Sequence, residues 1–350
     1  MKILKSTAAV LILLAALTGC SAASVAESNS ASSETSRQEF STSKAETDTE
    51  NTSVRIGSLK GPTSIGLVHM MEDAGQSDTY EFTIAAAADE LLASMVSEQL
   101  DIALLPANMA SILYNKTEGG VSVIDINTLG VLYLISGDSS ISSWNDLEGK
   151  TIYLTGKGTT PDYVLQYLLK EQANRNGFSA DSVTLEYKSE ATEIAALLKE
   201  NPDAVGLLPQ PFAAAAMSQN EVLNIVFDMT AEWDAIQGAG GSRLVTGVTV
   251  VRNDFLKEHP ESVDDFLKSH ESSAALANSE ADATAALVVK AGIIEKESIA
   301  QKALPYCSIV YIDGEEMKSA LSGYLHVLFE QNPKSVGGAL PSDDFYYMPQ

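Results

Sequence analysis

The chain has 350 residues, 45% of them hydrophobic, and carries 47 Asp and Glu against 22 Lys and Arg, which gives a formal net charge of −25. This apolar content excludes a chain that is disordered throughout, and the acidity argues against nucleic acid as a partner. Two cysteines, Cys20 and Cys307, are too few for a disulfide scaffold, a cysteine-based zinc site or an iron–sulfur cluster. The length predicts two domains once the ends are set aside.

Residues 1–19 are typical of a secretory signal peptide. Lys2 and Lys5 precede the ten-residue apolar run Ala8–Leu17, which is shorter than the roughly twenty residues that span a bilayer. The run ends in Leu17-Thr18-Gly19-Cys20, which resembles a bacterial lipobox. The resemblance implies cleavage before Cys20 and a diacylglycerol on its sulfur. An ordinary signal peptide followed by an incidental cysteine is the alternative.

The segment 20–53 is predicted to be a lipidated cysteine followed by a disordered tether. Residues 21–53 contain ten Ser, five Thr and only one aromatic residue, Phe40, so they cannot bury enough apolar surface to fold. Lipidation with two acyl chains is enough for stable anchoring. We therefore expect a protein held on the extracytoplasmic face of the cell membrane through a lipid anchor at Cys20.

From Val54 onward, short apolar strands alternate with amphipathic helices, a pattern typical of parallel α/β units. One series runs from Val54 to Ile135 and a second from Trp144 to Phe227. The two resemble each other, because Asp101-Ile-Ala-Leu-Leu-Pro106 in the first is similar to Asp203-Ala-Val-Gly-Leu-Leu-Pro209 in the second. The alternative is that all α/β units look alike.

After the second series the chain is predicted to return to the first lobe. Leu244–Val251 is a predicted strand, Asn253 is the predicted N-cap of the next helix, and helices follow to Gln331. The expected division is 54–135 plus 245–350 for lobe one and 136–244 for lobe two. The two crossings, near residue 136 and near Gly240–Leu244, would form the hinge.

Candidate binding residues follow from the rule that open parallel sheets bind ligands beyond the carboxyl ends of their strands. Four strand-to-helix turns matter here: 60–64, 106–108, 157–161 and 209–212. We expect Thr63 or Ser64 to cap one helix and Thr160, followed by Pro161, to cap another, so that free N–H groups favour an anionic or polar group. The candidate ligand-binding residues are Lys60, Gly61, Thr63, Ser64, Asn108, Lys157, Gly158, Thr159, Thr160 and Gln210.

Structural roles are open for several of these residues. Lys60 and Lys157 could be solvated surface lysines, and Asn108 and Gln210 could simply cap helices. Arg243, near the predicted hinge, is expected to pair with one of the many acids rather than with a ligand.

No catalytic motif emerges from the chain. The four histidines lack metal-ligand spacing, and there is no Gly-x-Ser-x-Gly elbow, Walker loop or Rossmann fingerprint. We therefore expect no catalytic residues, no metal, no cofactor and no enzymatic activity.

Several short motifs together resemble a known family. They are Ile56-Gly57, Asp101–Pro106, Asp146-Leu-Glu-Gly-Lys150, Gly158-Thr-Thr-Pro161, Leu208-Pro-Gln-Pro211 and Val248–Asn253. In this order and behind a lipobox, they resemble the substrate-binding lipoproteins of ABC importers from the aliphatic-sulfonate, taurine, nitrate and thiamine-precursor group. The resemblance runs from about Val54 to Gln331.

This resemblance implies an α/β protein of the type II periplasmic-binding-protein fold, with two lobes, a central cleft and a hinge. It implies a monomer that captures a small organic solute, such as a sulfonate, taurine- or nitrate-like compound or a pyrimidine precursor. The solute would pass to an ABC permease and its ATPase. Two alternatives stay open: a surface sensor that transports nothing, and an enzyme similar to the pyrimidine synthase of the same fold, whose cysteine-rich motif has no match here.

Overall fold

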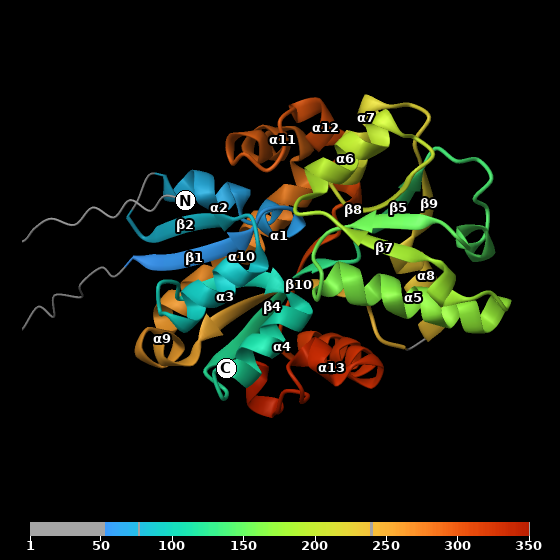
Figure 1. Ribbon diagram of the computed structural model, residues 1–350. Helices are drawn as coiled ribbons and strands as arrows, with labels where there is room; N and C mark the ends of the chain where they lie inside the picture. Colours follow the sequence, from blue (N-terminus) through green and yellow to red (C-terminus); the bar gives the residue numbers. More distant parts are fainter. Residues whose placement is uncertain (1–52, 76–77, 239–240, 350) are drawn as a thin grey trace, which may run out of the picture. The chain divides into compact units, whose positions relative to one another are not determined.

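A computed structural model of the protein describes residues 53–75, 78–238 and 241–349, which contain two mixed β-sheets (Figure 1). The predicted signal peptide, Cys20 and most of the tether lie outside the described residues. The six-stranded sheet has the order β11-β4-β10-β3-β1-β2, and the five-stranded sheet has the order β7-β6-β8-β5-β9. We call the six-stranded sheet with the helices packed on it lobe one, and the five-stranded sheet with its helices lobe two.

The strands of lobe one are β1 (Val54–Leu59), β2 (Tyr80–Ala85), β3 (Ile102–Pro106), β4 (Val121–Leu129), β10 (Val245–Arg252) and β11 (Ile309–Ile312). Those of lobe two are β5 (Leu132–Ser136), β6 (Thr151–Leu154), β7 (Thr184–Tyr187), β8 (Val205–Pro209) and β9 (Asn224–Asp228).

The helices are α1 (Pro62–Ile65), α2 (Val68–Ala74), α3 (Ala88–Val96), α4 (Ala107–Lys116), α5 (Thr160–Asn176), α6 (Ala191–Glu200), α7 (Phe212–Gln219), α8 (Met229–Gln237), α9 (Asn253–Glu258), α10 (Pro260–Ser279), α11 (Ala281–Lys290), α12 (Glu297–Ala303) and α13 (Gly314–Gln331). Short 3-10 turns, among them Pro333–Val336, follow α13.

Sheet topology confirms the predicted similarity of the two series. In lobe one, β1 pairs in parallel with β2 and β3, and in lobe two, β6 pairs in parallel with β7 and β8. Each sheet is then extended by an antiparallel strand whose chain comes from the other lobe, β10 beside β3 and β4, and β5 beside β8 and β9. The lobes therefore share one plan, with the carboxyl ends of three parallel strands on the same edge of each sheet.

The predicted boundary between the lobes at residue 136 is wrong by one strand. The prediction places residues 132–135 in lobe one, but β5, to which they belong, pairs with β8 and β9 of the five-stranded sheet. The crossing instead lies at Gly130 and Val131, which have φ angles of +57° and +69°. The left-handed backbone turns the chain out of one sheet and directly into the other.

Successive residues of a strand face opposite sides of the lobe-one sheet and pack against different helices. Along β1, Ile56 packs with residues of α2 and α10, whereas Gly57 faces α3 on the opposite face of the sheet. A Cβ at Gly57 would overlap the side chains of Leu91 and Leu100, so the missing side chain allows the close approach of α3. Gly206 of β8 does the same for Ile194 and Leu198 in lobe two.

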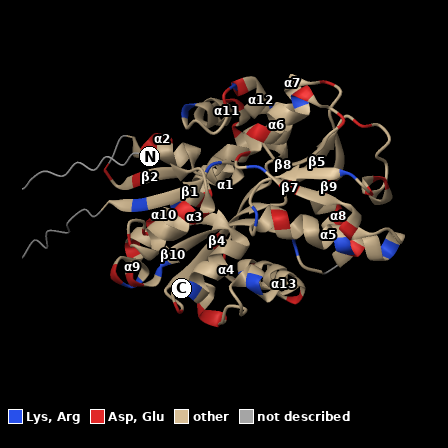
Figure 2. Ribbon diagram, viewed as in Figure 1, with Lys and Arg blue, Asp and Glu red and all other residues tan. Residues whose placement is uncertain are grey.

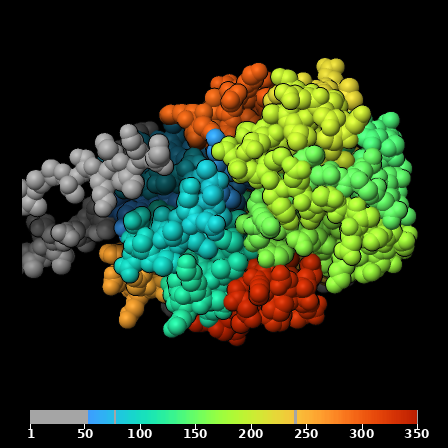
Figure 3. Space-filling view, viewed as in Figure 1, coloured from blue at the N-terminus to red at the C-terminus, as the bar shows by residue number. Residues whose placement is uncertain are grey.

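Helix α13 packs across the junction of the lobes. It contacts α4 and β4 of lobe one and α5 of lobe two, and Figure 3 shows its red surface beside both the cyan and the green parts of the chain. The Tyr324 ring of α13 lies 5.5 Å from the Trp233 ring of α8, and neither side chain is exposed. The C-terminal part of the chain thus contributes to both lobes.

Some local predictions need correction. Strand β11 and helix α8 were not predicted. Asn253 is not an N-cap: the backbone of Arg252 takes that position, while the Asn253 amide donates to the Gly119 carbonyl and accepts from the Ser122 hydroxyl. The sequence pattern suits a cap, but these two neighbours, more than 130 residues away in the chain, compete for the same side chain.

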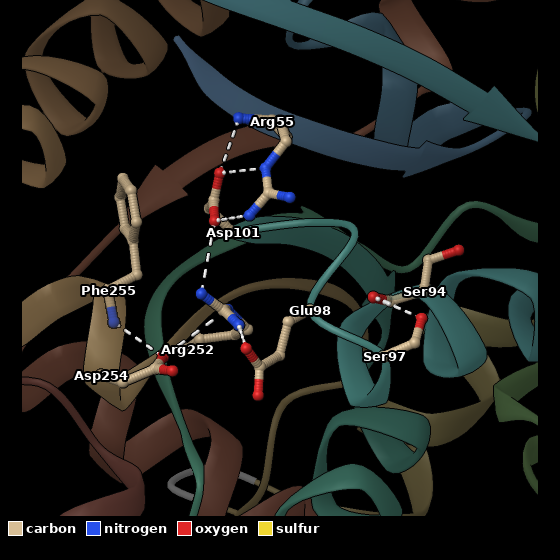
Figure 4. A network of polar contacts seen from close by, with 8 residues as sticks. All are labelled: Arg55, Ser94, Ser97, Glu98, Asp101, Arg252, Asp254 and Phe255. Atoms are coloured by element: carbon tan, nitrogen blue, oxygen red, sulfur yellow. Dashed lines mark hydrogen bonds and ion pairs between the residues drawn. The ribbon is translucent and has the colours of Figure 1, made fainter. Parts of the chain in front are cut away.

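An ion-pair network joins three strands at the end of the lobe-one sheet opposite the strand-to-helix turns (Figure 4). Asp101 has a side chain that is 2% exposed, and it accepts two hydrogen bonds from the Arg55 guanidinium, at 2.9 and 2.5 Å. Arg252 lies 3.5 Å from the same carboxylate and 3.2 Å from Glu98. The network links β1, the residue before β3 and the end of β10.

Candidate ligand-binding cleft

A cavity of about 590 Å³ lies between the two lobes. Its wall is built from the carboxyl ends of β1, β2 and β3 with the helix starts that follow them, and from the corresponding parts of β6, β7 and β8. All four turns that the sequence singled out contribute to it, through residues that include Thr63, Pro106, Gly158 and Phe212. The volume lies within the roughly 300–1,000 Å³ typical of small-molecule sites.

Six of the ten candidate residues line this cavity: Lys60, Thr63, Lys157, Gly158, Thr159 and Thr160. The other four, Gly61, Ser64, Asn108 and Gln210, are buried and are not among the lining residues. The structure therefore divides the candidates into a wall and a layer beneath it.

Two further turns line the cavity and were missed from the sequence. Ala86–Asp89 connects β2 to α3, and Ser189–Thr192 connects β7 to α6. Both follow parallel strands, so the rule that selected the other turns applies to them as well. They differ in sequence from the four selected turns, because neither contains the Lys-Gly pair found after β1 and β6 or the proline found at the ends of β3 and β8.

The predicted helix caps are wrong. Helix α1 has Gly61 as its N-cap residue, and the hydroxyls of Thr63 and Ser64 donate backward to the Leu59 carbonyl at 2.8 and 2.7 Å. Helix α5 begins at Thr160, not after it, with Thr159 as N-cap, and the Thr159 hydroxyl donates to the Gly156 carbonyl at 2.6 Å. A positive φ at Gly61 and at Gly156 bends each turn so that the hydroxyls reach these carbonyls.

The start of α5 lies at the cavity wall. No side chain of the described residues caps this helix, so its first N–H groups keep their capacity to donate. In a helix of 17 residues, the positive end of the dipole adds to that tendency. That these donors face a ligand stays a prediction, and the residues predicted as caps do not act as caps.

Asp162 organises the turn that precedes α5 from within lobe two. Its carboxylate is buried and accepts from the Gly158 N–H at 2.8 Å, the Gln166 amide at 2.6 Å and the Tyr187 hydroxyl at 2.7 Å. Burial raises the pKa of the Tyr187 hydroxyl well above its usual range, and the hydrogen bond to the Asp162 carboxylate raises it further. The Lys157 ammonium lies 5.1 Å from the centre of the same Tyr187 ring, an attractive cation–π arrangement.

Three lysines bring positive charge to the cavity wall: Lys60 and Lys116 from lobe one, and Lys157 from lobe two. None of them has an ion-pair partner among the described residues, whereas Lys150, Lys188, Lys268, Lys290 and Lys318 do. Asp89 and Glu190 are the acids of the wall. On a chain whose surface is dominated by acidic residues (Figure 2), this leaves a local excess of positive charge.

The buried candidates make defined contacts beneath the wall. The Gln210 amide oxygen accepts from the Ala214 N–H at 3.1 Å, within the first turn of α7. The Asn108 amide nitrogen donates to the carbonyls of Gly158 and Ser335. Arg243 pairs with Glu316 at 2.9 Å, which confirms the expected structural pairing.

One part of the chain is similar to a known protein family. Residues 118–283 match the family described as NMT1/THI5 like. The matched segment runs from the turn before β4 through the whole of lobe two to α11. The chain matches no curated protein.

Solved structures share the fold. An ABC transporter structure from Parabacteroides distasonis has a TM-score of 0.70 at 23% identity, over 85% of this chain and 99% of that one. The aliphatic sulphonate binding protein SsuA from Escherichia coli has a TM-score of 0.66 at 14% identity, over 85% and 92%. The ligand-binding component of an ABC-type import system from Staphylococcus aureus, with zinc bound, gives 0.65 at 15%, over 84% and 96%. The chain therefore has the two-lobed periplasmic-binding-protein fold expected from the resemblance.

The described residues contain neither a metal-binding cluster nor a helix able to cross a membrane. No group of three or more His, Cys, Asp and Glu side chains there could hold a metal ion. Within the same ranges, no helix has both the length and the apolarity needed to cross a membrane.

Proposed function

We propose that this protein is the solute-binding lipoprotein of an ABC importer, and that it captures a small organic molecule between its lobes and delivers it to a membrane permease and its ATPase. The observation that carries the proposal is the cavity between the lobes, with donors and lysines from both of them. A ligand that contacts both walls favours the closed arrangement by its differential affinity for it. The names of the structurally similar transporter components support the same role.

The lining favours an organic solute with a negatively charged or strongly polar head group. Lys60, Lys157 and the uncapped start of α5 supply donors on one part of the wall. Apolar side chains supply the rest, among them Leu92, Met109 and Phe212. An inorganic anion such as nitrate, only a few water volumes of about 30 Å³ in size, would leave most of the 590 Å³ unfilled. Sulfonates, taurine-like compounds and polar pyrimidines fit this description better.

Thermal denaturation of the full chain with a panel of compounds tests the proposal. The panel contains taurine, alkanesulfonates including MOPS, nitrate, short carboxylates and pyrimidine bases. A compound present at 100 times its dissociation constant stabilises the folded state by about 2.7 kcal/mol, which is easily detected. A panel that leaves the melting temperature unchanged throughout would count decisively against solute capture.

Lysine variants locate the site of any compound that binds. Lys157→Gln removes the ammonium at the cavity wall and is expected to weaken binding of an anionic compound about tenfold. Lys170→Gln is the matched control, because Lys170 lies exposed on α5, outside the cavity, and the same charge is lost. Equal affinities for the two variants would remove Lys157 from the site.

The lipid anchor at Cys20 is a separate part of the proposal with its own test. Metabolic labelling with a fatty acid is expected to mark the wild-type chain and a Cys307→Ser variant, but not a Cys20→Ser variant. The Cys307 thiol is buried, so its loss controls for the general effect of removing a cysteine. Label retained in the Cys20→Ser variant would overturn the anchor.

Two other functions remain as alternatives with distinct outcomes. A surface sensor would bind the same compound, but deletion of its gene would leave uptake of that compound unchanged, and no permease and ATPase genes would lie beside it. An enzyme similar to the pyrimidine synthase of this fold would convert the bound compound, which mass spectrometry of the incubated mixture would detect.

A further inference from the structure

Asn108 was expected to contact the ligand, but it joins the two lobes beneath the cavity. It is the second residue of α4, directly after the carboxyl end of β3, and its side chain is fully buried. Its amide nitrogen lies 3.0 Å from the Gly158 carbonyl of lobe two and 3.0 Å from the Ser335 carbonyl. The Thr160 hydroxyl of lobe two donates to the amide oxygen at 3.4 Å.

These contacts use the full donor capacity of the side chain. An amide nitrogen has two hydrogens, and both are directed at carbonyl oxygens, which can only accept. That requirement also settles which end of the amide is the nitrogen. No hydrogen therefore remains for a ligand, in agreement with the position of Asn108 below the cavity wall.

Both backbone polar groups of Gly158, its N–H and its carbonyl, form hydrogen bonds to side chains. Within lobe two its N–H donates to Asp162, and from lobe one its carbonyl accepts from Asn108. Gly158 has a φ of +78°, and a Cβ there would meet nothing within 4 Å, so backbone conformation and not space favours glycine. Because Gly158 lines the cavity, the bond from Asn108 reaches directly into the wall of the other lobe.

The C-terminal segment orients the Asn108 amide. Ser335 belongs to the 3-10 turn Pro333–Val336, which is fastened along α4 by the Ser111 hydroxyl and the Asn115 amide, both donating to the Val336 carbonyl at 2.8 Å. One amide hydrogen is thus committed to a fixed acceptor in this segment, and the planar side chain directs the other at Gly158.

We propose that Asn108 is a positioning residue that ties lobe one to the Gly158 turn of lobe two and holds that part of the cavity wall in place. The tie is made by groups of the protein itself, so it goes beyond the proposed function and does not depend on the identity of the solute. It restrains opening at the cleft, and binding affinity then depends on Asn108 without contact to the ligand.

Hydrogen exchange of the ligand-free full chain tests this tie. Asn108→Asp keeps the size of the side chain but replaces the donor nitrogen by an acceptor oxygen that faces two carbonyls. It is expected to speed exchange of the backbone amides in 156–163 about tenfold, the size of the effect of one buried hydrogen bond. Asn108→Ala is expected to act in the same direction, and the isosteric Asp variant carries the test if the Ala variant folds poorly.

Ser111→Ala is the matched control. It removes a buried hydrogen bond from the same helix to the same C-terminal turn, but the Asn115 amide still holds the Val336 carbonyl. Among the described residues Ser111 has no hydrogen bond to lobe two, so exchange in 156–163 is expected to stay at the wild-type rate. Wild-type exchange in Asn108→Asp would overturn the proposal, and so would equal acceleration by Ser111→Ala, because the effect would then be a general loosening of α4. Since no solute is added, neither result depends on whether the protein binds one.

Discussion

The hydroxyl of Tyr187 donates to the carboxylate of Asp162 at 2.7 Å, and this bond connects a strand end of lobe two to the turn that lines the cleft. The same carboxylate holds the Gly158 N–H, and the Tyr187 ring lies beneath the Lys157 ammonium. One aromatic residue therefore supports both the backbone and the positive charge of this wall. The Asn108 tie holds the same turn from the other lobe.

Substitution of Tyr187 is expected to separate these two roles. Tyr187→Phe loses the hydrogen bond to a buried carboxylate and is expected to destabilise the protein by about 1.5–3 kcal/mol, while it keeps a ring under Lys157. Tyr187→Ala is expected to lose ligand affinity as well, since the cation–π contact is worth about 0.5–1 kcal/mol at an exposed site. Urea denaturation and binding titrations measure the two effects.

Tyr153→Phe provides the comparison for Tyr187→Phe. The Tyr153 ring lies 5.2 Å from the Lys188 ammonium, in the same sheet but outside the cavity wall. We expect its loss of stability to be smaller. A stability loss for Tyr187→Phe no greater than that for Tyr153→Phe would show that the bond to Asp162 contributes little.

Removal of the Asp101 carboxylate is expected to be costly. Arg252 has a side chain that is only 11% exposed and sits between Asp101, Glu98 and Asp254. Asp101→Ala leaves this guanidinium and that of Arg55 without their shared buried partner, and the loss of one partner of a buried pair costs about 3–5 kcal/mol. Guanidinium chloride denaturation measures the change in the free energy of unfolding.

The control for this variant is Asp265→Ala. Asp265 forms an exposed pair with Lys268 one turn away on α10, and such pairs contribute about 0–1 kcal/mol. If the two variants lost similar free energy, the network at the end of the lobe-one sheet would have no special weight in the fold.

The crossing between the sheets is expected to be sensitive to a single methyl group. Gly130 has a φ of +57°, and a Cβ there would overlap the Thr230 hydroxyl at the start of α8. Gly149 has a similar φ of +75°, but a Cβ there would meet nothing within 4 Å. Alanine at either position is expected to cost about 1–2 kcal/mol for the left-handed backbone, and only Gly130→Ala adds a steric penalty.

Thermal denaturation of the two alanine variants checks this difference. A larger fall in melting temperature for Gly130→Ala identifies the contact with Thr230 as the cause, since both variants share the backbone penalty. Equal falls would mean that the chain at the crossing moves to accommodate the methyl group without cost.

Cys307 makes stability depend on alkaline pH. Burial raises the pKa of its thiol to about 12, above the value of about 8.5 for an unfolded cysteine. The folded state therefore retains a proton that the unfolded state loses between these values. The contribution of the thiol to stability is complete below about pH 8.5 and declines as the pH rises toward 12.

Two measurements check the prediction for Cys307. In a Cys20→Ser chain, a thiol reagent at pH 8 is expected to label no cysteine until the protein is unfolded, and then to label one. The free energy of unfolding is expected to fall between pH 8 and 10, and less so in a Cys307→Ala variant. Rapid labelling of the folded Cys20→Ser chain would contradict the buried state of the thiol.

Local sequence determined the alternation of strands and helices and the four turns that line the cleft. The first strand, Val54–Leu59, begins where the predicted series begins, because apolar residues at strand spacing, followed by Gly61 and Pro62, define a strand and its end without help from distant residues. The similarity of Asp101–Pro106 and Asp203–Pro209 likewise predicted two lobes of one plan, since the same pattern of local preferences builds the same unit twice.

Only the tertiary structure decided where the polar side chains point and which sheet each strand joins. β5 has the composition of a buried strand in either sheet, and the left-handed backbone at Gly130 and Val131 directs it to lobe two. Asn108 was predicted to contact a ligand because it follows a strand end, but its hydrogen-bond partners lie 50 and 227 residues away in the chain. A side chain with equal capacity for several partners bonds to those that folding brings within 3 Å, and local sequence does not encode that distance.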